Sequence, residues 1–118
     1  MNEADTRAEL IDPQLKAVGW GEIEGSRIQR EYSINSGEIR AGGIRAGQLK
    51  ADYILIYKNR KLAVVEAKAD ELEVGEGVGQ AKLYAQKLQL ETSYAANGKA
   101  IYEICLKTGE EGEVEAFP

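Results

Sequence analysis

The stretch from Ala51 to Lys68, ADYILIYKNRKLAVVEAK, constrains the fold more than any other part of the chain. Two apolar runs flank Lys58-Asn59-Arg60, which predicts two neighbouring strands joined by a hairpin. The hairpin brings Asp52, at the start of the first strand, close to Glu66, at the end of the second. Because residues two apart on a strand share a face, Glu66 and Lys68 point the same way. Two carboxylates and an ammonium group are therefore expected to meet at one end of an apolar sheet.

This combination of side chains is suited to phosphodiester hydrolysis. Two carboxylates with a neighbouring backbone carbonyl form a hard oxygen site of the kind that binds Mg²⁺. Such a metal lowers the pKa of a bound water and polarises a phosphoryl oxygen, and an adjacent lysine can orient or deprotonate that water. The same three residues can also be ordinary solvated charges at strand ends, because this spacing often occurs by chance. Their spacing alone leaves both interpretations open.

Composition is that of a soluble globular protein. A chain of 118 residues is expected to form one domain, and 43% hydrophobic with 30% charged residues argues against disorder. No apolar run is long enough to span a bilayer, and the acidic N-terminus lacks the apolar segment of a secretory signal. We therefore expect a cytoplasmic protein without membrane association. Because there is no histidine and a single cysteine, Cys105, zinc sites, histidine-based triads and an internal disulfide are excluded.

Positive charge gathers in one part of an otherwise acidic chain. The net charge is −5, yet the segment from Arg27 to Lys61 holds eight basic residues against three acidic ones, a net charge of +5. A basic segment beside a carboxylate pair suits a phosphate backbone, although a solvated surface of mixed charge accounts for the same pattern. The candidate DNA-binding residues are Arg27, Arg30, Arg40, Arg45 and Lys50. Two of them lie in a glycine-rich stretch, residues 36–48, which reads as a flap over the substrate or as a long hairpin connection.

Two helices are predicted from apolar spacing. Leu10, Ile11, Leu15 and Val18 indicate a helix over residues 3–18 that breaks and restarts at Asp12-Pro13. A second helix is expected over residues 80–90, with Gln80 and Tyr84 on one face because they are four residues apart.

Strands account for most of the remaining chain. Alternation places Ile28, Arg30, Tyr32 and Ile34 on one face of a first strand, and Asn97-Gly98 indicates a two-residue hairpin near the C-terminus. The acidic residues 109–118 look like a tail or linker. The order helix, three strands, helix, two strands predicts an α/β fold with a mixed central sheet flanked by helices.

With these residues assembled, the chain resembles the PD-(D/E)XK nuclease superfamily. The motifs are Ala51-Asp52 and Glu66-Ala67-Lys68 in an αβββαβ order, with Gln80-x-x-x-Tyr84 on the following helix as in RecB-like nucleases. Within the superfamily the chain is most similar to the N-terminal endonuclease domain of type I restriction enzyme R subunits. The likeness covers nearly the whole chain, and the order of the motifs makes it more specific than any one of them.

The resemblance implies a restriction-endonuclease-like fold and a role for each matched residue. Asp52, Glu66 and the Ala67 carbonyl would bind Mg²⁺, for which Mn²⁺ can substitute, and Lys68 would position or activate the attacking water. Glu9 matches the helix acid that often joins the metal shell in this superfamily. Gln80 and Tyr84 match a helix motif that contacts DNA or supports the catalytic lysine, whereas from the sequence alone Tyr84 is equally a core residue. DNA is the expected substrate.

Two departures from the family limit what is carried over. The hallmark proline is Ala51 here, and R subunits are long chains with ATP-driven motor domains. This chain contains no GxxxxGK[ST] phosphate loop, so no ATP site is expected in it. Motor domains and the modification and specificity subunits would be partners, and the chain is either an excised domain or a free-standing relative. A non-cleaving binding or assembly module, or a nuclease for RNA or branched DNA, remains an alternative.

Overall fold

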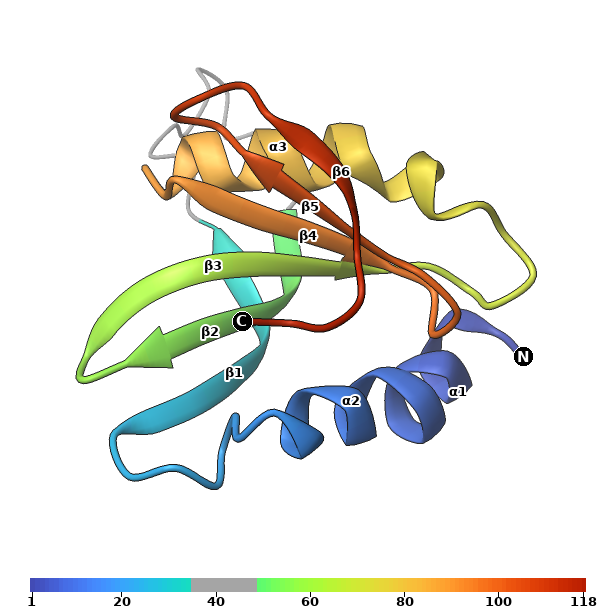
Figure 1. The fold of residues 1–118 in the computed structure, drawn as a ribbon, viewed down its shortest axis with the longest axis horizontal. Helices are drawn as coiled ribbons and strands as arrows, with labels where there is room; N and C mark the ends of the chain where they lie inside the picture. The colour runs from blue at the N-terminus through green and yellow to red at the C-terminus, as the bar shows by residue number, and fades with distance from the viewer. Residues whose placement is uncertain (35–48) are drawn as a thin grey trace, which may run out of the picture.

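A six-stranded mixed sheet forms the centre of the computed structural model, which describes residues 1–34 and 49–118 (Figure 1). The strands lie in the order β1-β2-β3-β4-β5-β6, and only the β3–β4 pair among them is parallel. Helix α3 covers one face and the N-terminal helices cover the other (Figure 1). This arrangement confirms the predicted α/β fold class. Within the described ranges, no helix is long and apolar enough to cross a membrane.

The elements follow the predicted order as far as β5, and a sixth strand that the sequence did not predict, β6, comes after it. Their bounds are α1 Glu3–Thr6, the π-helical turn η1 Arg7–Ile11, α2 Asp12–Ala17, β1 Ser26–Ile34, β2 Leu49–Tyr57, β3 Arg60–Ala67, the short helix η2 Val74–Gly77, α3 Val78–Lys87, β4 Thr92–Ala96, β5 Ile101–Cys105 and β6 Glu111–Val114. The crossover from β3 through α3 to β4 is what allows these two strands to be parallel.

The two predicted hairpins have different outcomes. At the first, Lys58 and Asn59 both have positive φ angles, 49° and 65°, and Tyr57 pairs with Arg60, as a two-residue turn requires. At the second, Ala96 pairs with Ile101, so the loop comprises residues 97–100 and is longer than predicted. The Asn97 side-chain oxygen accepts the backbone N–H groups of Lys99 and Ala100, at 3.0 and 2.8 Å, and thereby stabilises the longer loop.

The sheet buries an apolar cluster on each face. The cluster under the N-terminal helices includes Ile11, Leu15, Tyr53, Leu55, Val65 and Tyr94. The cluster under α3 includes Ile34, Ala51, Ile54, Ile56, Val64, Tyr84 and Ala85. Since both faces are covered, β2 and β3 are apolar on both sides, which explains the continuous apolar runs in the sequence.

The first helix passes through Pro13 without the predicted break. Proline has no N–H, and its ring crowds the carbonyl four residues earlier. Here the turn before Pro13 widens, and the Asp12 N–H donates to the Arg7 carbonyl five residues back. The π-helical turn η1 therefore accommodates the proline, and α1, η1 and α2 run on as one continuous rod (Figure 1).

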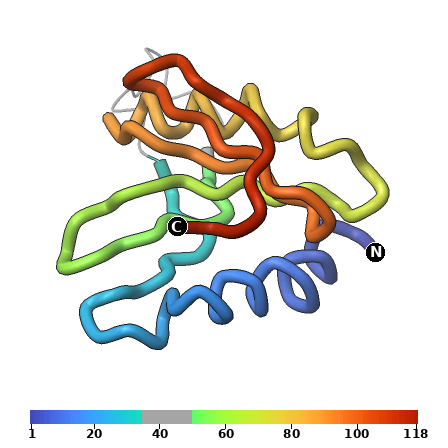
Figure 2. The backbone as a smooth tube through the Cα atoms, in the orientation of Figure 1, coloured from blue at the N-terminus to red at the C-terminus, as the bar shows by residue number. Residues whose placement is uncertain are grey.

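The C-terminal segment is part of the fold, which corrects the expectation that residues 109–118 form a tail or linker. Residues Glu111–Val114 form β6 at the edge of the sheet, and the chain then turns back across it (Figure 2). Phe117 is buried and packs edge-to-face on Tyr94, with ring centroids 5.6 Å apart. The Trp20 indole N–H donates to the Pro118 carbonyl at 2.8 Å. Sequence reasoning missed this role because residues 109–118 are mostly acidic or glycine and contain few apolar side chains.

Candidate active site

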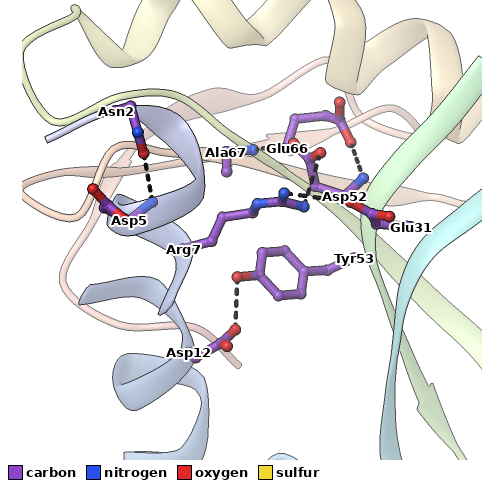
Figure 3. Close-up of polar contacts among 9 residues, drawn as sticks. All are labelled: Asn2, Asp5, Arg7, Asp12, Glu31, Asp52, Tyr53, Glu66 and Ala67. Atoms are coloured by element: carbon purple, nitrogen blue, oxygen red, sulfur yellow. Dashed lines mark hydrogen bonds and ion pairs between the residues drawn. The ribbon is translucent and has the colours of Figure 1, made fainter. Parts of the chain in front are cut away.

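Asp52 and Glu66 lie together where β2 and β3 meet, as the hairpin predicted (Figure 3). The backbone N–H of Asp52 donates to Oε2 of Glu66 at 2.8 Å, and the N–H of Ala67 donates to Oδ2 of Asp52 at 2.8 Å. Each carboxylate is thus fixed by the opposite strand through one oxygen. Oδ1 of Asp52 and Oε1 of Glu66 are the oxygens left for a cation.

Burial raises the pKa of both carboxyl groups. Only 2% of Glu66 is exposed, and burial, reinforced by the charge of Asp52, raises the pKa of Glu66 to about 8. Burial also raises the pKa of Asp52, against the opposing effect of the Ala67 N–H. Two desolvated carboxylates that repel each other are stabilised by a cation between them. The donor set therefore fits a divalent metal held by Asp52, Glu66 and the Ala67 carbonyl.

Lys68 follows β3 directly and stands beside this pair. Its backbone N–H donates to the Ala96 carbonyl at 2.8 Å, and its charge lowers the pKa of both Asp52 and Glu66. The aliphatic part of Lys68 runs past Gly77 at the start of α3. A Cβ atom at Gly77 would lie 3.3 Å from Cγ and 3.6 Å from Cε of Lys68, so the glycine makes room for the lysine stem.

Arg7 is a member of the site that sequence reasoning missed. Its guanidinium lies 3.5 Å from Oδ1 of Asp52 and 3.4 Å from Oε1 of Glu31 (Figure 3). Although burial opposes its charge, Asp52 and Glu31 together raise the pKa of Arg7. A signal was available in the sequence, because Arg7 lies four residues before the buried Ile11 and therefore on the inward side of the helix.

Glu31 lies between two paired positions of β1, Arg30 opposite Tyr53 and Tyr32 opposite Ala51, and has an unusual backbone. Its φ angle is 51°, a left-handed conformation that costs a non-glycine residue roughly 1–2 kcal/mol. Face alternation changes at this point of β1: Ile28 packs against the cluster under the N-terminal helices, whereas Tyr32 and Ile34 pack under α3. The predicted single face for Ile28, Arg30, Tyr32 and Ile34 is corrected, because alternation assumes a regular strand throughout.

The structure does not bring Glu9 to the strand carboxylates. Glu9 is exposed on η1, and no group of three acidic, cysteine or histidine side chains close enough to hold a metal occurs in residues 1–34 and 49–118. The helix acid whose charge raises the pKa of both Asp52 and Glu66 is Glu3. Glu3 lies one helical turn before Arg7, so both extend from the same side of the N-terminal helix.

Gln80 and Tyr84 share a face of α3, as predicted from their spacing. The Gln80 amide donates to the Tyr84 hydroxyl at 2.6 Å, and Tyr84 is 4% exposed within the cluster under α3. Tyr84 is therefore a core residue, and its hydroxyl orients Gln80. Their proposed contact with DNA stays a prediction.

The candidate DNA-binding residues are only partly described. Arg27, Arg30 and Lys50 are exposed, whereas Arg40, Arg45 and the glycine-rich stretch 36–48 lie outside the described residues. Arg30 pairs with Asp12 at 3.5 Å and stacks 5.8 Å from the centre of the Tyr53 ring. A pocket of about 320 Å³ separates the N-terminal helix from β1 and is lined by Ala4, Arg7, Ala8, Asp12, Arg30, Glu31 and Tyr53.

Known proteins are similar to this chain in sequence and in fold. Residues 24–115 match the family model described as the second domain of the type I restriction enzyme EcoKI endonuclease subunit. The chain belongs to the endonuclease-subunit family of type I restriction enzymes.

Two relatives show what share of an endonuclease subunit this chain covers. It is 31% identical over 102 residues to the type I restriction enzyme EcoAI endonuclease subunit of Escherichia coli, covering 83% of this chain and 12% of the relative. It also matches a fragment assigned as the HsdR subunit of a type I restriction enzyme from Vibrio vulnificus YJ016, with a TM-score of 0.88 and 39% identity. That match covers 100% of this chain and 24% of the solved chain. The chain thus spans a small part of either relative, and its fold is restriction-endonuclease-like, as the resemblance implied.

Proposed function

We propose that this chain is a Mg²⁺-dependent endonuclease domain that hydrolyses phosphodiester bonds of DNA within a type I restriction system. The observation that supports the proposal best is the pair of carboxylates, buried Glu66 and half-buried Asp52, fixed by each other's strands, with Lys68 beside them. Membership of the endonuclease-subunit family supports the same conclusion.

Each residue has a distinct part in the proposed reaction. Asp52, Glu66 and the Ala67 carbonyl would hold the metal, which would supply a Lewis acid that lowers the pKa of a bound water and polarises the scissile phosphate. Lys68 holds the attacking water in line through its ammonium group and offsets charge that develops on the phosphorus oxygens. Gln80, oriented by Tyr84, lies on the neighbouring helix and contacts the DNA backbone or supports Lys68.

Delivery of DNA is assigned to other parts of the enzyme. The exposed Arg27, Arg30 and Lys50 contribute phosphate contacts, yet a net charge of −5 opposes tight binding by this chain alone. We therefore expect motor domains and the modification and specificity subunits to bring DNA to the site, and cleavage by the isolated chain to be slow.

One observation favours a second candidate function, a non-cleaving module for binding or assembly. Arg7 already places a positive charge on Oδ1 of Asp52, the oxygen that a metal would need. If Arg7 were a permanent substitute for the metal, the fold would keep its shape without catalysis.

The deciding experiment is cleavage of supercoiled plasmid with Mg²⁺ or Mn²⁺ at high protein concentration. Lys68→Ala is expected to lower the rate by about 10²–10⁴-fold, as is typical when a residue that handles the proton of the attacking water is lost. The matched control is Lys82→Ala, which removes the same side chain from α3, where Lys82 pairs with Glu111 at 2.6 Å. Cleavage that is equal in Lys68→Ala would contradict the proposal. No cleavage by any variant, together with no metal-induced rise in melting temperature, would favour the non-cleaving module.

A further inference from the structure

The contacts of Arg7 indicate a role that depends on metal binding. Its guanidinium is shared between two carboxylates on neighbouring strands, Asp52 and Glu31, at 3.5 and 3.4 Å. These contacts use different nitrogen atoms, so either can persist when the other is lost. Figure 3 shows the side chain extending from the N-terminal helix toward Asp52 and Glu31.

The two carboxylates are not equivalent. Asp52 belongs to the candidate metal site, and its Oδ2 is already engaged by the Ala67 N–H. Arg7 therefore lies on the one Asp52 oxygen that remains for a metal. Glu31 is 59% exposed at its side chain, lies outside that site, and has a left-handed backbone with a φ angle of 51°.

We propose that Arg7 is a tethered counter-ion of the metal site, which neutralises Asp52 until a divalent cation binds and then moves fully onto Glu31. The inference rests on the proposed metal-dependent function. Before metal binds, the positive charge of Arg7 offsets the repulsion between the carboxylates of Asp52 and Glu66. Once metal binds, Glu31 keeps the guanidinium beside the site, where it is available to a phosphate group of the nucleic acid.

This role predicts opposite changes in Mn²⁺ affinity when Arg7 and Glu31 are replaced. Removing Arg7 removes a competitor for Asp52, so Arg7→Gln is expected to tighten Mn²⁺ binding by about threefold to tenfold, the range of a partly exposed ion pair. Removing Glu31 leaves the displaced Arg7 without an anchor, so Glu31→Gln is expected to weaken Mn²⁺ binding.

The test is isothermal titration calorimetry of Mn²⁺ into the 118-residue chain, its two single variants and the double variant. The double-mutant cycle compares the effect of Glu31→Gln in two backgrounds. The loss of Mn²⁺ affinity should be at least threefold larger in the wild-type chain than in the Arg7→Gln variant, because Glu31 acts on the metal site by holding Arg7. Arg30→Gln is the charge-matched control, since Arg30 makes a pair of the same 3.5 Å length with Asp12. It is expected to change the Kd less than twofold.

The possible outcomes separate this inference from the proposed function. Unchanged or weaker Mn²⁺ binding by Arg7→Gln, or additive effects in the cycle, would overturn the role of Arg7 alone. Absence of Mn²⁺ binding to wild type and all variants would overturn the metal-dependent function and this inference with it. If Arg7→Gln does not fold, Arg7→Met takes its place, because methionine removes the charge and keeps an unbranched apolar stem that packs adaptably. Tighter binding by Arg7→Met supports the proposal, and equal or weaker binding overturns it.

Discussion

Glu66 shows how one residue can link the stability of the fold to its chemistry. A glutamate is seldom buried to 2% exposure unless something stabilises its charge. Here one Asp52 N–H contributes a hydrogen bond, while Asp52 itself and the surrounding apolar strands oppose ionisation. The side chain is therefore held in place but poorly neutralised, which is the condition in which a divalent cation adds most to the stability.

The pKa of Glu66 predicts how stability changes with pH. Because the folded-state pKa, about 8, exceeds the ordinary value of 4.5, the folded chain retains a proton that the unfolded chain releases. The retained proton therefore contributes to the free energy of unfolding. This contribution is complete below about pH 4.5 and is lost as the pH rises toward 8. Without metal, the free energy of unfolding is expected to fall across that range, and Glu66→Gln should flatten the decrease.

When metal is present, the stability of the folded chain is expected to increase with pH instead of decreasing. Mn²⁺ must displace the Glu66 proton, so its affinity is expected to rise by up to tenfold per pH unit toward about pH 8. Thermal melts of wild type and Glu66→Gln at about pH 5 and pH 8, with and without Mn²⁺, measure both effects. A pH-independent melting temperature in metal-free wild type would contradict the raised pKa.

The N-terminal helix decides which acid lies near the site. The widened turn at Pro13 keeps α1, η1 and α2 continuous, so Glu3, Arg7 and Ile11 lie along one side of it. Glu9 lies on another side and is exposed. The position of an acid around the helix therefore matters more than its distance from the apolar stripe in the sequence.

Two matched variants test this assignment at the level of the element. Glu3→Gln is expected to weaken Mn²⁺ binding about threefold to tenfold, because the charge of Glu3 acts on both strand carboxyls. Glu9→Gln removes the same charge and should change the Kd less than twofold. The measurement is calorimetric titration, and a larger effect of Glu9→Gln would restore Glu9 as the helix acid of the site.

At the scale of the whole molecule, the two ends of the chain help to close the core under the N-terminal helices. Phe117 packs on Tyr94, Trp20 donates to Pro118, and both aromatic anchors belong to the cluster that includes Ile11 and Tyr53. The surface that positions Arg7 and Asp52 is thus supported by Phe117, which lies 65 residues after Asp52 and 110 residues after Arg7 in the sequence.

Phe117→Ala is expected to lower the free energy of unfolding by about 2–4 kcal/mol, somewhat below the full cost for a central phenylalanine because the segment lies near the chain end. Urea denaturation followed by circular dichroism measures the change, with the exposed Glu115→Ala as the control. A loss no larger than that of Glu115→Ala would show that the C-terminal segment does not support the core.

The sequence by itself determined the order of the elements as far as β5, the hairpin at Lys58-Asn59 and the meeting of Asp52 with Glu66. These features depend on local spacing, and a two-residue turn between apolar strands leaves little freedom in which residues face each other. The motifs in this order were also enough to indicate the family. The roles of Lys68, Gln80 and the metal stay predictions until they are measured.

Only the tertiary structure decided that Arg7 and Glu3 lie near the strand carboxylates and that Glu9 does not. The same holds for Phe117 in the core and for the left-handed Glu31. The spacing of Arg7 and Ile11 indicated only that Arg7 faces inward. The carboxylates that Arg7 contacts, the irregularity of β1 at Glu31 and the burial of Phe117 depend on contacts between distant parts of the chain. Such positions are set by long-range packing, in which residues far apart in the chain share one buried surface.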